Sequence, residues 1–213
     1  MGKHMRIVMG AVIVLVLAAL ACGTPSKSRS AVLLEDDFSS TSTGWEVGSW
    51  PGGSVGYKSG AYSVVSNGGG DTMWGVANSS FSDVVINVDT QQISAPANDN
   101  NGYGVVCREQ GDGNGYYLLI SGDGGYAIVK AQNDRFVPLV EWTRTDAVKQ
   151  GNASNHIEAT CNGTTLTLVV NGTRVATVED STYSKGDIAF TVTSYEDGEP
   201  SEVLFDNVKV TKP

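Results

Sequence analysis

Histidine, cysteine and basic side chains are scarce in this chain of 213 residues. It has 2 histidines and 3 cysteines, and 23 Asp and Glu residues outnumber 14 Lys and Arg residues, which gives a formal net charge of −9. A nucleic-acid partner is disfavoured, because phosphate binding relies on clustered Lys and Arg. Beyond the N-terminal segment, His156 is the one histidine, too few for a His-rich metal site. The sequence also lacks the H-E-x-x-H and Walker patterns.

Segments rich in Ala, Leu, Glu and Lys are missing beyond the N-terminal apolar run, whereas glycine is abundant, with 26 residues. Short alternating segments separated by turn residues, such as 83–93, indicate about a dozen strands. Asn162-Gly163 and Asn171-Gly172 between apolar runs are typical of hairpin turns. The polar stretch 143–151 could hold one helical turn. The pattern predicts an all-β fold, a two-sheet antiparallel β-sandwich or jelly roll.

The N-terminus has the layout of a signal peptide. Residues 1–6 carry Lys3 and Arg6, residues 7–20 are almost wholly apolar, and small residues precede Cys22. The segment Ala19-Leu20-Ala21-Cys22 resembles the lipobox of bacterial lipoproteins. We therefore expect a signal peptide at 1–21, lipidation of Cys22, a flexible tether at 22–30 and an extracytoplasmic domain at 31–213, held at the membrane through the lipid alone. An uncleaved anchor and an ordinary secretory signal are the alternatives.

Two cysteines remain if Cys22 carries lipid. Cys107 and Cys161 form an even pair in an oxidising compartment, which predicts a disulfide between them. The alternative is a pair of buried free thiols, which pack as small hydrophobic groups.

Several phrases spread over the predicted domain resemble the LamG-like, concanavalin A-like lectin/glucanase superfamily. They include DDFSS from position 36, YKSGAYSV from 57, NNGYGVVCR from 100, LTLVVNGTRVATVED from 166 and FDNVKV from 205. The resemblance implies a concanavalin A-like jelly roll. Related domains are named for the hydrolysis of keto-disaccharides, and others are glucanases or calcium-binding lectins. The shared motifs are structural, so the resemblance specifies the fold well and the function poorly.

Laminarinase-like glucanases of this superfamily carry alternating carboxylates of the form E-x-D-x-x-E on one strand. Glu35 and Asp37 could share one face of a strand here, but Ser40 stands where the third carboxylate would be. The departure favours a non-catalytic role.

The segment 100–121 indicates two strands joined by an acidic, glycine-rich turn. Sugars are held by exposed rings together with polar groups. We expect candidate ligand-binding residues in and around this segment: Asn100, Asn101, Tyr103, Arg108, Tyr116, Tyr126 and Trp142. The alternative is that the rings pack the sandwich core, as we expect for Trp45 and Phe205. Trp50 and Trp74 lie in glycine-rich surroundings where exposure is plausible.

Oxygen-bearing side chains in the same region suggest a calcium site as a second hypothesis. The candidate ligands are Asp99, Asp112, Asn114 and Asp123. The same residue types also form turns without any ion.

These observations favour an envelope-anchored, non-catalytic binding module with a glycan or another envelope component as its partner. A carbohydrate hydrolase of the same fold is the alternative, and a protein-interaction or structural module is the third possibility.

Overall fold

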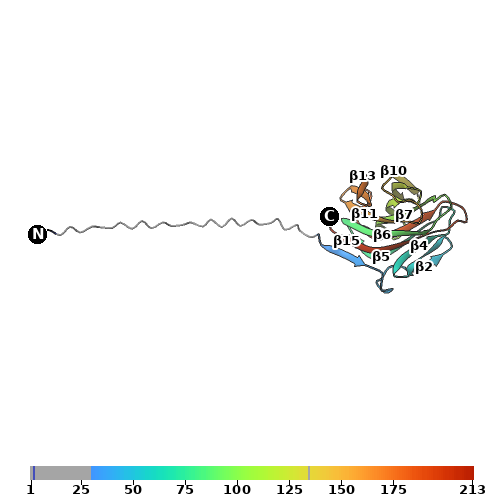
Figure 1. The fold of residues 1–213 in the computed structure, drawn as a ribbon, viewed down its shortest axis with the longest axis horizontal. Helices are drawn as coiled ribbons and strands as arrows, with labels where there is room; N and C mark the ends of the chain where they lie inside the picture. Colours follow the sequence, from blue (N-terminus) through green and yellow to red (C-terminus); the bar gives the residue numbers. More distant parts are fainter. Residues whose placement is uncertain (1, 3–29, 134) are drawn as a thin grey trace.

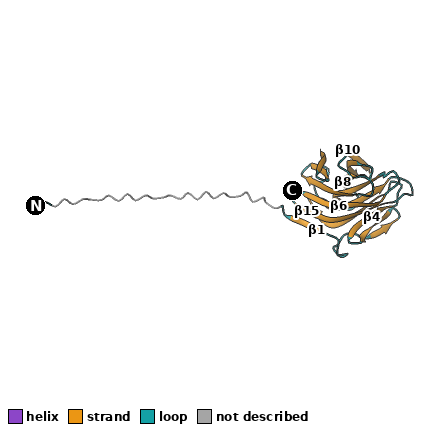
Figure 2. Ribbon diagram, viewed as in Figure 1, coloured by secondary structure: helices purple, strands orange, loops and turns teal. Residues whose placement is uncertain are grey.

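A computed structural model describes Gly2 and residues 30–133 and 135–213 of the chain (Figure 1). Within those ranges the chain forms strands joined by turns and loops, without a helix (Figure 2). The strands are β1 (Val32–Asp36), β2 (Gly48–Trp50), β3 (Gly53–Lys58), β4 (Ala61–Ser66), β5 (Thr72–Phe81), β6 (Val84–Ser94), β7 (Asn101–Glu109), β8 (Gly115–Ile120), β9 (Gly125–Gln132), β10 (Arg135–Arg144), β11 (Ser154–Asn162), β12 (Thr165–Val170), β13 (Thr173–Glu179), β14 (Gly186–Ser194) and β15 (Ser201–Thr211).

The strands form two antiparallel sheets. The nine-stranded sheet has the order β13-β12-β11-β6-β15-β4-β3-β2, with β1 also paired to β15, and the six-stranded sheet has the order β10-β9-β8-β7-β14-β5. The sheets pack face to face, with β13 and β10 at one side and β2 and β5 at the other (Figure 1). The predicted antiparallel β-sandwich is confirmed.

The core lies between the sheets and includes the two rings predicted for it. Trp45 and Phe205 are 4% and 0% exposed. Phe190 of β14 stacks between them, with ring centroids 4.8 Å from Trp45 and 4.5 Å from Phe205. Stacked rings of this kind add to the burial energy and fix the spacing of the two sheets.

The predicted disulfide is confirmed and joins the sheets. Cys107 lies on β7 of the six-stranded sheet and Cys161 on β11 of the nine-stranded sheet, and their Cα atoms are 6.8 Å apart. Both residues are fully buried.

Local turn chemistry explains one predicted hairpin, and one local prediction is wrong. Asn171 and Gly172 have φ angles of 49° and 82°, the positive pair that a type I′ turn needs between β12 and β13. The helical turn that 143–151 could hold does not form: β10 continues to Arg144, which pairs with Gly125 of β9, and residues 145–151 form turns and loop.

The predictions for the N-terminus fall almost entirely outside the described ranges: the signal peptide at 1–21, lipidated Cys22 and the tether at 22–30. In the part of the chain that the structure describes, no helix is long and apolar enough to cross a membrane.

Candidate functional site

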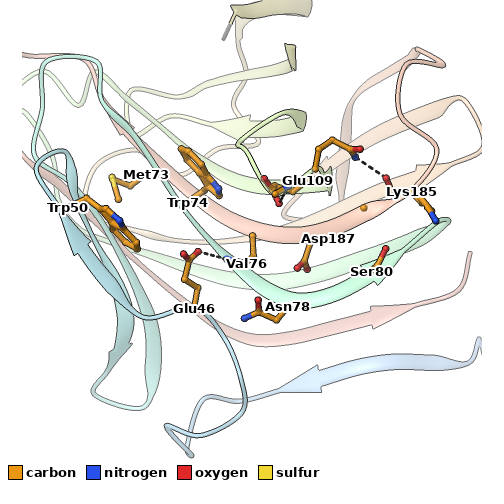
Figure 3. Close-up of a pocket in the computed structure, with 13 residues that line it drawn as sticks. Glu46, Trp50, Met73, Trp74, Val76, Asn78, Ser80, Glu109, Lys185 and Asp187 are labelled. Atoms are coloured by element: carbon orange, nitrogen blue, oxygen red, sulfur yellow. Dashed lines mark hydrogen bonds between the residues drawn. The ribbon is translucent and has the colours of Figure 1, made fainter. Parts of the chain in front are cut away.

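A cleft of about 700 Å³ runs along β5, the edge strand of the six-stranded sheet (Figure 3). Side chains of β5 alternate, so Met73 and Ala77 enter the core while Trp74, Val76 and Asn78 lie on the outer face. The lining residues are Glu46, Trp50, Met73, Trp74, Val76, Asn78, Ser80, Glu109, Gln110, Gly111, Lys185, Gly186 and Asp187.

Two tryptophan rings form one end of the cleft (Figure 3). Trp50 on β2 is 45% exposed, and its ring lies so close to Gly48 that a Cβ there would overlap it. Trp74 lies against Gly113, where a Cβ would come within 2.9 Å of the indole. Because Tyr117 Oη also donates to the Gly113 carbonyl oxygen at 2.7 Å, the turn between β7 and β8 is folded back over the outer face of the sheet.

A β-bulge at Arg108 places a carboxylate in the cleft. Glu109 pairs with Asp187 and Cys107 pairs with Ile188, which leaves Arg108 as the extra residue, with a φ of 57°. The extra residue reverses the alternation that holds along the rest of β7, so Glu109 lies on the outer face opposite Asp187. Asn78, with the same φ of 57°, lies at the irregularity in the pairing of β5 with β14.

Backbone N–H groups hold both carboxylates. The Glu109 oxygens accept hydrogen bonds from the amides of Gly111 at 2.8 Å and Gly113 at 2.7 Å, and the side chain is buried. Asp187 accepts from the Ser79 amide at 3.1 Å. Burial raises the pKa of Asp187, and the nearby charge of Glu109 raises it further. Asp187 therefore binds a proton more readily than an isolated aspartate does.

Glu46 forms the other wall, from the segment that follows the core residue Trp45. Its amide donates to the Val76 carbonyl oxygen at 3.0 Å, so this segment covers the free edge of β5. Lys185 lies at the far end of the cleft (Figure 3). The arrangement combines two rings, three carboxylates, amide groups and one ammonium group, which suits a polyhydroxylated ligand.

A smaller hollow of about 290 Å³ lies where β7 begins, at the opposite end of that strand. Its lining residues are Asn100, Asn101, Ser121, Asp123, Gly125, Trp142, Thr143, Arg144 and Tyr195. Three of the predicted ligand residues, Asn100, Asn101 and Trp142, are brought together here, but Asn101 is buried and its side chain bonds to Gln92 and to the Gly122 amide.

The other predicted ligand residues face the sandwich interior, which corrects the expectation that they contact a glycan. Tyr103 and Tyr116 are fully buried, and Tyr126 packs against the core on the same side of its sheet. Arg108 is 2% exposed, and its guanidinium donates to the carbonyl oxygens of Ser82, Gly163 and Tyr183 and to Asp83. A buried side chain that donates four hydrogen bonds to the surrounding protein is not available to a ligand.

The four candidate calcium ligands do not form one site. Asp99 precedes β7 and Asp123 lies at the β8–β9 turn, whereas Asp112 and Asn114 follow β7 at its other end. The nine residues of β7 separate the two pairs by on the order of 25 Å. Asp112 instead bonds to Asn114 in its own turn, and across the described ranges no three His, Cys, Asp or Glu side chains gather as a metal site requires.

Comparisons with known proteins agree with the architecture. The chain has a carbohydrate-binding or glycoside-hydrolase-like fold of the concanavalin A type, as the sequence resemblance predicted. The model of the family described as "3-keto-alpha-glucoside-1,2-lyase-like domain" matches residues 32–211, and the chain belongs to this family. A search of curated protein sequences gives no match.

Three solved structures illustrate the likeness. The carbohydrate-binding module CBM66 from Bacillus subtilis has a TM-score of 0.65 at 18% identity, covering 80% of this chain and 96% of that one. A Bacillus licheniformis β-glucanase has a TM-score of 0.62 at 11% identity, covering 84% and 98%. A protein of unknown function with a galectin-like fold from Bacillus subtilis has a TM-score of 0.62 at 13% identity, covering 86% and 97%. At these identities the likeness shows the fold alone.

Proposed function

We propose that the cleft along β5 binds carbohydrate without transforming it. The observation that supports this most is the pair of tryptophans, Trp50 and Trp74, at one end of a cleft whose other lining side chains are mostly polar. The face of an indole is electron-rich, and the C–H groups on the face of a pyranose ring lie favourably against it. Polar groups along the cleft then bind the sugar hydroxyl groups: the amide of Asn78 can donate and accept hydrogen bonds, and the carboxylate of Glu46 can accept them.

Charge within the cleft narrows the ligand class. Glu46, Glu109 and Asp187 face a single cation, Lys185. An acidic sugar would meet like charges in a partly desolvated space, which disfavours its binding. Neutral glycans with gluco-configured rings, whose faces carry mostly C–H groups, are the favoured ligands.

The four tryptophans of the chain provide the test. The indole N–H resonances of the ¹⁵N-labelled full-length protein are followed by NMR during titration with cellohexaose, laminarihexaose and maltohexaose. The Trp50 and Trp74 signals should shift with at least one of these sugars, while that of Trp45, buried in the core, stays in place. Loss of binding in Trp74→Ala, with the Trp45 signal unchanged, would support the cleft. Stationary Trp50 and Trp74 signals with every glycan offered would refute it.

We further propose that the domain acts at the outer side of a bacterial membrane as a lipoprotein anchored through Cys22. The apolar N-terminal run and the lipobox-like segment before that cysteine support this. Cells fed an alkyne analogue of palmitate should incorporate it into the wild-type chain and not into Cys22→Ser. Equal labelling of both would exclude lipidation at this position.

A lyase is the second candidate, favoured by the paired carboxylates of Glu109 and Asp187. A 1,2-elimination on a 3-keto-α-glucoside removes the C2 proton, which the ketone acidifies, forms the C1=C2 double bond and expels the C1 oxygen substituent. Such a reaction needs one ionised carboxylate as base and one acid for the departing oxygen. The raised pKa of Asp187 suits the acid, and Glu109 is then the base.

Release of nitrophenolate from 4-nitrophenyl 3-keto-α-glucoside distinguishes the two candidates. An enzyme would release it, and both Glu109→Gln and Asp187→Asn would abolish the release. Binding of the sugar hexamers without nitrophenolate release would leave the non-catalytic proposal standing.

A further inference from the structure

We propose that the hollow at the start of β7, lined by Trp142, Tyr195, Asn100, Asp123 and Arg144, is a second carbohydrate-binding site for one neutral hexose unit. The proposal does not rest on the function of the cleft along β5, because the two sites share no lining residue.

Two glycines hold the Trp142 ring in place over the sheet. A Cβ on Gly102 would come within 3.2 Å of this ring, and one on Gly125 within 3.1 Å. Gly102 shares the outer face of β7 with Val106, and Gly125 shares that of β9 with Ala127. The indole therefore lies close to bare backbone on the outer face, and it remains 42% exposed. A large aromatic ring with one face packed on the backbone and the other open to solvent can stack against the face of a sugar.

A second ring borders the same hollow. Tyr195, in the loop between β14 and β15, is 40% exposed, and its hydroxyl lies near Gly102, 3.0 Å from where a Cβ would be. A tyrosine here offers an apolar ring edge together with a hydroxyl group that can donate and accept. The two rings come from loop and strand segments more than fifty residues apart in sequence, which only the fold brings together.

The two charged residues that line the hollow form a neutral ion pair. Arg144 Nη2 lies 2.8 Å from Asp123 Oδ2, and Arg144 Nη1 also donates to the Asp123 carbonyl oxygen. The Asn100 side chain donates to Glu196 Oε1 at 2.8 Å and is itself exposed, which leaves its own oxygen available. Because the one cation of the hollow is already paired with a carboxylate, an anionic sugar finds no free charge here. Hydroxyl groups of a neutral hexose match the remaining donors and acceptors.

The hollow is far enough from the cleft to be occupied independently. Asn101 begins β7 and Glu109 ends it, so the two sites lie on the order of 25 Å apart along this strand. A monosaccharide can reach one site at a time, whereas a long glycan could contact both and gain avidity from the pair.

Methyl β-glucopyranoside, methyl α-glucopyranoside and methyl β-galactopyranoside are the probes for the test, each titrated into the ¹⁵N-labelled full-length protein. The Trp142 indole N–H signal should shift and saturate with at least one of them, with the Trp45 signal constant as evidence of an intact core. Trp142→Ala should lower the affinity for that sugar by about tenfold or more, measured from the shift of the Gly125 backbone amide signal. Phe136→Ala is the matched control, because Phe136 is a more exposed ring on the same strand, at 54%, outside the hollow.

Four outcomes decide the proposal. A Trp142 response that persists in Trp74→Ala supports a separate second site, even when the Trp50 and Trp74 signals never move and the cleft proposal fails. A Trp142 signal that stays in place with all three sugars overturns the second site, whatever the cleft does. A Trp142 response that Trp74→Ala abolishes also overturns it, because the hollow would then only sense binding in the cleft. Equal loss of affinity in Phe136→Ala and Trp142→Ala would overturn the assignment to this hollow.

Discussion

Removal of the disulfide between Cys107 and Cys161 should cost about 4 kcal/mol of unfolding free energy. The two cysteines are 54 residues apart in sequence. A cross-link that closes a loop of this length lowers the entropy of the unfolded chain by an amount that corresponds to about 4 kcal/mol at 25 °C in the chain-entropy model. Small domains have total stabilities of about 5–15 kcal/mol, so the disulfide contributes a large share.

Urea unfolding of the double variant Cys107→Ala/Cys161→Ala measures this cost. Because the unfolded chain expands once the cross-link is gone, the denaturant m-value should rise while the unfolding midpoint falls. The reduced wild-type protein is the matched control, since it keeps both sulfur atoms and loses only the bond. A loss below about 1 kcal/mol in both proteins, with an unchanged m-value, would refute the chain-entropy reasoning.

Three further changes test the electrostatics of the fold. Arg108→Gln should cost about 3 kcal/mol in urea unfolding, because three carbonyl oxygens lose the charged donor that the buried guanidinium provides, whereas the exposed Arg174→Gln should change stability by less than about 0.5 kcal/mol. Equal effects would contradict the structural role of Arg108. Asp187→Asn should raise the melting temperature at pH 7. Burial and Glu109 raise the pKa of this aspartate, so the wild type loses stability as pH rises through that pKa, and the gain from the substitution should shrink in acid. A gain that is the same at pH 3 and pH 7 would be inconsistent with this cause. Burial alone would raise the pKa of Asp180, but hydrogen bonds from Lys130, Thr182 and Tyr116 outweigh it and lower the pKa. Asp180→Asn should therefore destabilise the protein at pH 7. In thermal melts across pH, the variant should also lose less stability than the wild type below about pH 4.

The fold was predictable because its signals are local. Alternation along 83–93 and the Asn171-Gly172 turn require only neighbouring residues, and both appear in the structure as expected. The pairing of Cys107 with Cys161 followed from compartment and counting rather than from geometry.

The candidate site was less predictable because the β-bulge at Arg108 controls it. Alternation counted through Arg108 puts that side chain on the outer face, but the bulge turns it inward and brings Glu109 out beside Asp187. The positive φ of a non-glycine residue carries no clear sequence signal, and the opposing strand is nearly eighty residues away. Trp50 and Trp74 were recognisable as rings in glycine-rich surroundings, yet only the sheet pairing shows that they border the same cleft.

The hydrogen bonds of Arg108 have a consequence for the thermodynamics of binding. This one side chain joins the loops at Ser82, Gly163 and Tyr183, which lie at the end of the sandwich where Glu109 enters the cleft. The loops around that end of the cleft are therefore ordered before any ligand arrives. A ligand that enters the cleft would lose little free energy to ordering the protein, so its affinity should depend mainly on the contacts it makes. Calorimetry should then give a heat-capacity change that matches the surface buried on the ligand and the cleft walls, without the larger change that accompanies folding of a loop on binding.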